Sequence, residues 1–159
     1  MPFCFAHFRR ALTILLLVTV GAALAQSPVP EPKTNAFNDP FVQVTKGIAN
    51  CPAPPGPGYT AQEARLQAHY RAERGTSCFR AGRCRLPNAY LYDADIIERT
   101  EKAIVIDGRF TNTSVWAEGQ RRWVTLSGCV RNAQDALELE KLVRNLDDVE
   151  SVINLLQVR

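Results

Sequence analysis

The sequence contains few of the residues that most often carry enzymatic chemistry. It has two histidines, His7 and His69, and none of its five cysteines belongs to a C-x-x-C pair. It also lacks a glycine-rich loop of the kind that holds phosphate groups. Ser114 and Ser127 have no evident histidine partner besides His69, and the carboxylates are scattered along the chain. We therefore expect no enzymatic activity, no cofactor and no bound metal.

The sequence also has no apolar run of the roughly 20 residues that a membrane-spanning helix needs. An uncharged apolar core, Ala11–Ala25, follows Arg9 and Arg10 and ends in an A-x-A pattern before Gln26. A short positive region, an apolar core and a small-residue cleavage site are typical of a signal peptide. We expect residues 1–25 to be cleaved during export to the periplasm. A retained membrane anchor is the alternative.

Export gives the cysteines a structural interpretation. The exported chain retains four of them: Cys51, Cys78, Cys84 and Cys129. An even number in an oxidising compartment favours two disulfide bonds, for which three pairings exist. We prefer Cys78 with Cys84, which closes a tight loop, and then Cys51 with Cys129. A zinc site is the alternative, with these ligands: His69, Cys51, Cys78 and Cys84.

Proline and arginine separate two parts of the chain before residue 93. Residues 26–58 contain "SPVPEPK" and "CPAPPGPG", which are typical of extended polyproline segments, so we expect a Pro-rich linker there. Residues 59–92 are expected to form a helical extension rich in arginine and cysteine. Thr60 and Glu63 have the spacing of a capping box, and Gly75 is expected to end the helix.

Residues 93–159 show alternating helical and strand periodicity. A helix is expected over residues 93–107, with Asp93 or Asp95 as its N-cap, and a second helix after Asn132. The strands are "TSVWA" and "RWVTLSGCV", joined through "EGQR", and then "VESVINLLQV". This order predicts an α+β fold, a three-stranded sheet with both helices on one face. The expected core of the sheet is Val124, Leu126, Val130, Val152, Leu156 and Val158, packed on Ile97, Ile104, Leu139, Val143 and Leu146.

This order of elements, αββαβ, resembles the BON domain, named for bacterial osmotically inducible and nodulation proteins. The similar residues begin with Asp93 and Ile96, continue with V-x-L-x-G-x-V over residues 124–130, and end with V-x-x-V-x-N-x-L-x-V over residues 149–158. The family usually has glycine before the last strand, where this chain has Asp148. The resemblance implies a non-enzymatic role in the cell envelope, in phospholipid binding, envelope maintenance or osmotic stress, or as an interaction or scaffold module.

Two surfaces are candidates for such a role. Residues 26–92 contain eight basic and four acidic residues, whereas residues 93–159 contain nine basic and twelve acidic ones. The extension therefore offers a cluster that would attract anionic phospholipid: Arg65, Arg71, Arg74, Arg80, Arg83 and Arg85. The alternative is that these arginines only solvate a disulfide-tied surface. Nucleic acid is not an expected partner after export.

The second candidate is the sheet face opposite the two helices. Large apolar residues are expected there and would suit docking to an envelope protein: Trp116, Trp123, Ile153 and Leu155. Cys129 lies on the same face. We therefore expect the N-terminal extension to cover this face, held there by a disulfide bond.

Overall fold

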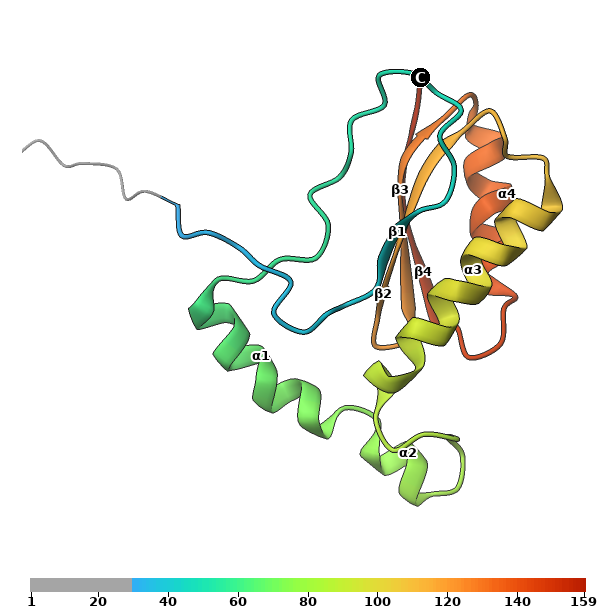
Figure 1. Cartoon of the computed structure of the whole chain (residues 1–159). Coiled ribbons are helices and arrows are strands. Elements are labelled where there is room, and N and C mark those ends of the chain that lie inside the picture. The colour runs from blue at the N-terminus through green and yellow to red at the C-terminus, as the bar shows by residue number, and fades with distance from the viewer. Residues whose placement is uncertain (1–29) are drawn as a thin grey trace, which may run out of the picture. The chain divides into compact units, whose positions relative to one another are not determined.

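The structure is a computed structural model that describes residues 30–159 (Figure 1). Residues 31–159 form one compact unit. The predicted signal peptide, residues 1–25, lies outside the described residues. Among the described residues, no helix has both the length and the apolar character needed to cross a membrane.

The second half of the chain folds in the predicted order of helix, strand, strand, helix and strand. The elements are α3 (Asp93–Asp107), β2 (Ser114–Gln120), β3 (Trp123–Val130), α4 (Ala133–Arg144) and β4 (Ser151–Val158). β2 and β3 are antiparallel, and β4 is parallel to β3 because α4 connects them. Both helices cover the same face of the sheet (Figure 1). The predicted α+β class is confirmed.

The prediction of three strands is wrong, because the sheet has four. Residues Phe41–Gln43, within the predicted linker, form β1, which pairs antiparallel with the outer edge of β2. The pairing continues beyond β1, where the N–H of Val44 donates to the carbonyl of Val115 at 2.8 Å. A strand of three residues is too short to show the two-residue alternation by which strands are recognised in a sequence.

The core lies between the sheet and the two helices, largely as predicted. Its buried members include Ile96, Ile97, Ile104, Phe110, Val115, Val124, Leu126, Val130, Leu139 and Val143. Leu146 and Leu156 are partly buried against this core. Val158 was predicted to be buried but is 57% exposed, because it is the last residue of the edge strand β4.

Two turns use residues other than glycine in left-handed backbone conformations. Arg121 and Arg122, with φ of 52° and 69°, form the two-residue connection between β2 and β3. The predicted turn residue Gly119 instead lies inside β2, where a Cβ atom would approach Ile97 Cγ1 to 2.7 Å. Asp148 has φ of 68°, so it adopts the conformation for which the family's usual glycine is suited.

The extension forms short helices: α1 (Ala61–Glu73), α2 (Thr76–Arg80) and the 3₁₀ helix η1 (Ala89–Tyr92). The predicted capping box is confirmed. The N–H of Glu63 donates to Thr60 Oγ1 at 3.2 Å, and the N–H of Thr60 donates to Glu63 Oε2 at 2.8 Å. Arg71 is the buried residue of α1, so this helix is fixed by polar contacts and not by an apolar stripe.

The preferred disulfide pairing is confirmed. Cys51 is bonded to Cys129 in β3, and Cys78 in α2 is bonded to Cys84. The first bond fastens the proline-rich segment to the sheet face opposite the helices. The zinc site expected as an alternative is contradicted, because three of its four ligands are in disulfide bonds.

The two disulfide bonds should differ in their effect on stability. Their cysteines are separated by 78 and 6 residues. Chain entropy predicts a loss of about 4 kcal/mol when Cys51 and Cys129 are both replaced by alanine, and about 2 kcal/mol for Cys78 and Cys84. Urea unfolding of the two double variants would measure both losses. Equal losses would contradict the assignment of the long bond as the main covalent constraint.

Candidate functional site

Arg71 makes a buried ion pair with Asp39, which lies just before β1. The guanidinium binds the carboxylate in a two-point contact, Nη1 to Oδ2 at 3.0 Å and Nη2 to Oδ1. The two residues are 9% and 4% exposed. The guanidinium also lies over two aromatic rings, 4.1 Å from the centroid of Phe37 and 3.8 Å from that of Tyr90. Burial alone would lower the pKa of Arg71, but the contacts with Asp39 outweigh it and raise that pKa.

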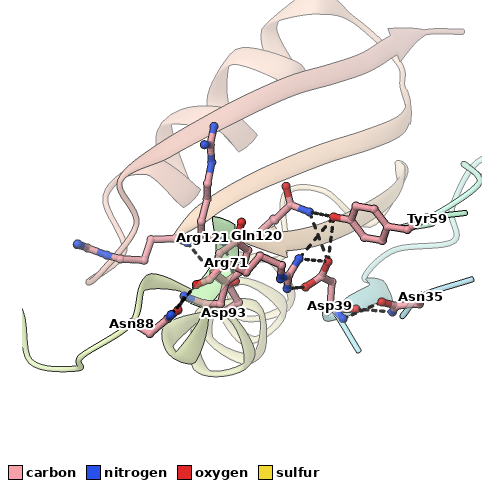
Figure 2. Close-up of polar contacts among 10 residues, drawn as sticks. Asn35, Asp39, Tyr59, Arg71, Asn88, Asp93, Gln120 and Arg121 are labelled. Atoms are coloured by element: carbon pink, nitrogen blue, oxygen red, sulfur yellow. Dashed lines mark hydrogen bonds and ion pairs between the residues drawn. The ribbon is translucent and has the colours of Figure 1, made fainter. Parts of the chain in front are cut away.

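The ion pair belongs to a network that joins three segments of the chain (Figure 2). The hydroxyl of Tyr59 and the amide of Gln120 at the end of β2 both approach Asp39 Oδ2 at 3.4 Å. Asn35 accepts from the N–H of Asp39 and donates to its carbonyl, both at 2.9 Å. Because Asp39, Arg71 and Gln120 come from the linker, α1 and the sheet, the network fixes these three parts together.

Asp93 makes the corresponding connection between α3 and the turn after β2. Its two carboxylate oxygens accept from the N–H groups of Arg121 and Arg122, each at 2.7 Å. The residue is 1% exposed. Desolvation raises the pKa of Asp93 to about 6, even though the two N–H donors act in the opposite direction. Asp93 or Asp95 was predicted as the N-cap of α3, but Tyr92 occupies that position and both aspartates lie in the first turn.

The structure separates the six arginines of the predicted lipid-binding cluster. The prediction that Arg71 belongs to a lipid-binding surface is wrong, because its guanidinium is buried in the ion pair with Asp39. Arg85 remains exposed but pairs with Asp148 at 3.3 Å and Asp95 at 3.9 Å. Arg74 is half-buried, with its guanidinium 5.5 Å from the ring centroid of Tyr70. The remaining three, Arg65, Arg80 and Arg83, are exposed and have no ion pair among residues 30–159.

Arg80 and Arg83 lie in a loop closed by the bond between Cys78 and Cys84, which we call the disulfide loop (residues 78–84). Phe79, which is 43% exposed, lies next to Arg80 in this loop. The loop contains no acidic residue. Figure 1 shows α2 and the loop projecting past the hairpin end of the sheet. The disulfide loop therefore presents an exposed aromatic residue together with two cations that have no ion pair among residues 30–159.

The sheet face opposite the helices is only partly open. Trp116, predicted to be on an interaction surface, is 7% exposed and so belongs to the interior. Trp123 is half-buried, because the guanidinium of Arg121 lies 3.8 Å from its ring centroid. Ile153 and Leu155 remain 38% and 57% exposed.

A groove on this face lies beside the long disulfide bond. Residues 52–55 of the proline-rich segment, together with Gly128 and Leu155, line a cavity of 270 Å³. The predicted cover of this face is therefore present near Cys129, where the proline-rich segment supplies it. This segment leaves most of the Leu155 side chain exposed.

Ser114, one of the two serines considered for catalysis, has a structural environment. Ser114 Oγ is buried, accepts from the N–H of Ile48 at 2.9 Å and donates to its carbonyl at 3.0 Å. Ser114 thus attaches the linker to β2. Among residues 30–159, no three His, Cys, Asp or Glu side chains are grouped as a metal site would require. His69 is exposed on α1.

Asp39, Gln120 and Asp93 are the polar residues whose roles the sequence interpretation missed. The stretch from Asn35 to Pro40 contains Asn and Asp followed by Pro, a composition typical of turns, and could have indicated an ordered segment. The sequence contains no corresponding signal for Gln120, since its contact with Asp39 joins residues 81 positions apart.

Comparison with known proteins relates the C-terminal part of the chain to a known family. Residues 92–159 match the family model of the BON domain. The match begins at the last residue of η1 and includes every element from α3 to β4. Among curated proteins, no sequence matches the chain at a significant level.

Replacing Arg71 should destabilise the protein more than removing the whole ion pair. In the Arg71→Met variant the Asp39 carboxylate remains buried without its partner, which typically costs about 3 to 5 kcal/mol. The double variant Arg71→Met with Asp39→Asn removes this charge as well. We therefore expect its free energy of unfolding to fall by less than half as much as that of the single variant. Urea unfolding followed by tryptophan fluorescence would compare them. A double variant as unstable as the single one would contradict this account of the pair.

Asp93 should make stability depend on pH in a defined direction. Because its pKa is about 6 in the folded chain and lower in the unfolded chain, the folded chain binds more protons between these values. Stability contributed by Asp93 should therefore fall as the pH rises from about 4 to about 7, by about 3 kcal/mol at most. The measurement is the free energy of unfolding of the native protein minus that of Asp93→Asn at each pH. A difference that is constant or rises with pH would contradict the raised pKa.

Proposed function

From the match of residues 92–159 to the BON domain family model, we propose that this protein is a non-enzymatic component of the bacterial cell envelope that binds anionic phospholipid surfaces. The proposal includes cleavage of residues 1–25, location in the periplasm, and a role in envelope maintenance or osmotic stress. The family match supports the general association with membranes. The described residues suggest which part of the chain makes the contact.

The observation that carries the proposal is the disulfide loop. Phe79 is exposed next to Arg80, with Arg83 three residues further along the same loop, and the bond between Cys78 and Cys84 restricts the loop. An aromatic ring beside cations suits the boundary between headgroups and acyl chains. A restricted loop also loses less conformational entropy on binding than a free one.

The charge distribution supports contact through this loop and not through the BON domain. Residues 76–85 contain three arginines and no acid, whereas residues 93–159 contain nine basic and twelve acidic residues. An anionic surface would attract the loop and repel the acidic domain. We therefore propose Arg80 and Arg83 as the principal contacts, Arg65 and Arg85 as weaker ones, and no direct role for Arg71.

Docking to an envelope protein is a second candidate function. It is favoured by Ile153 and Leu155, whose side chains remain exposed on β4 after the extension has folded against the sheet. Such docking would depend on apolar contact and little on salt concentration, in contrast to lipid binding.

Vesicle binding should depend on the arginines of the disulfide loop. Each arginine near an anionic surface contributes about 1 kcal/mol, so we expect Arg80→Gln with Arg83→Gln to weaken binding to phosphatidylglycerol vesicles roughly 30-fold. Phe79→Ala should weaken it further, even at high salt. Co-sedimentation of residues 26–159 with vesicles would measure both effects.

Arg131 and Arg159 provide a matched control, because both are exposed and lie away from the disulfide loop. Replacing these two with glutamine makes the same change in charge and should reduce binding far less. Equal losses in the two double variants would indicate a general charge effect and would contradict the loop mechanism. Loss of binding with Leu155→Ser alone would favour the apolar sheet face.

A further inference from the structure

A cavity of 390 Å³ lies between the end of α1, the disulfide loop and the turn regions of the BON domain. Cys78 and Cys84 line it on the side of the loop, and Tyr92 lines it on the side of η1. This volume falls within the range of sites that bind small molecules, about 300 to 1,000 Å³. The wall also contains four charged residues: Glu73, Arg74, Arg122 and Glu150.

Among residues 30–159, these four charged side chains form no ion pair with one another or with any other side chain. Nearby arginines behave differently, since Arg85 and Arg99 both pair with Asp148. Two positive and two negative groups thus line one cavity without neutralising each other directly. Such an arrangement leaves the two carboxylates and most of the guanidinium N–H groups available to a ligand.

Arg122 is held in position before any ligand binds. Its Nε donates to the carbonyl of Asp148 at 2.8 Å, and its guanidinium lies 5.0 Å from the ring centroid of Tyr92. Its Nη1 lies 3.8 Å from Cys84 Sγ. The N–H of Glu150 donates to the carbonyl of Arg122 at 2.9 Å, so the backbones of a cation and an anion are adjacent. A fixed guanidinium is well suited to binding a phosphate group.

The balance of charge restricts the class of ligand. A simple phosphate would be attracted by Arg74 and Arg122 but repelled by Glu73 and Glu150, and a simple amine would experience the reverse. A molecule that contains both a phosphate and a primary ammonium group could satisfy all four. We propose that this cavity binds a phosphoethanolamine group, with the phosphate on the arginines and the ammonium on the glutamates.

Two sources could supply this group: the headgroup of phosphatidylethanolamine in a membrane, or a soluble phosphoethanolamine compound. The cavity shares Cys78 and Cys84 with the disulfide loop, which favours the membrane lipid. That preference rests on the proposed function, whereas the chemistry of the cavity does not. The experiment therefore needs one arm with vesicles and one without any membrane.

The vesicle arm compares neutral membranes of phosphatidylcholine with neutral membranes that also contain phosphatidylethanolamine. Both headgroups are zwitterionic, but the quaternary ammonium of choline has no N–H to donate. We expect residues 26–159, which include the whole compact unit, to bind the ethanolamine-containing vesicles more tightly. The double variant Glu73→Gln and Glu150→Gln should lose about tenfold in this affinity, the loss of one charge-assisted contact.

A matched control is Glu101→Gln with Asp147→Asn, which makes the same change in net charge away from the cavity wall. It should keep the preference for ethanolamine. Neither double variant should weaken binding to phosphatidylglycerol vesicles, because both remove negative charge. This arm thereby separates a failure of the cavity assignment from a failure of the proposed function.

The membrane-free arm titrates soluble glycerophosphoethanolamine while amide NMR signals of Gly75 and Ser77, two residues of the cavity wall, are followed. Saturable shifts that glycerophosphocholine does not produce would support the cavity chemistry even if vesicles show no effect, and would point to a soluble ligand. A vesicle effect without such shifts would support the lipid headgroup as the source. The proposal is overturned if neither arm distinguishes ethanolamine from choline, or if the Glu73 and Glu150 variant behaves like its control.

Discussion

The buried pair of Arg71 and Asp39 is the interaction on which the arrangement of the extension depends. Helix α1 has no apolar stripe, so burial of hydrophobic surface cannot hold it against the BON domain. The guanidinium instead binds a carboxylate from the linker and lies over the rings of Phe37 and Tyr90. Because Gln120 of β2 approaches the same carboxylate, one polar cluster fixes linker, helix and sheet together.

This constraint explains why residues 31–92 and the BON domain, which differ in composition, form one structure. β1 extends the sheet, Ser114 binds Ile48, and the bond between Cys51 and Cys129 closes the segment over the opposite face. Arg121 adds a further contact, since it donates to the hydroxyl of Tyr70 at 3.0 Å and lies over Trp123. The extension therefore holds the disulfide loop and the charged cavity at defined positions relative to the BON domain, which a flexible tether would not do.

The parts of the fold that depend on local patterns were predictable from the sequence. The capping box of Thr60 and Glu63 and the order αββαβ each follow from residues close together in the chain, and the short disulfide bond closes a loop of the kind expected. The fourth strand and the buried pair were not predictable. β1 has three residues, and Arg71 lies 32 positions from Asp39. An arginine in a basic stretch looks the same in sequence whether it meets solvent or a buried carboxylate, so Arg71 was wrongly grouped with the surface cluster.

Because these contacts join them, the extension and the BON domain should unfold as one cooperative structure. Residue-by-residue amide hydrogen exchange under native conditions tests it directly. We expect the amides of α1, around Arg71, to exchange with an opening free energy close to that of β3 in the core. Rapid exchange throughout α1, with β3 fully protected, would show that the extension opens independently and would contradict the account.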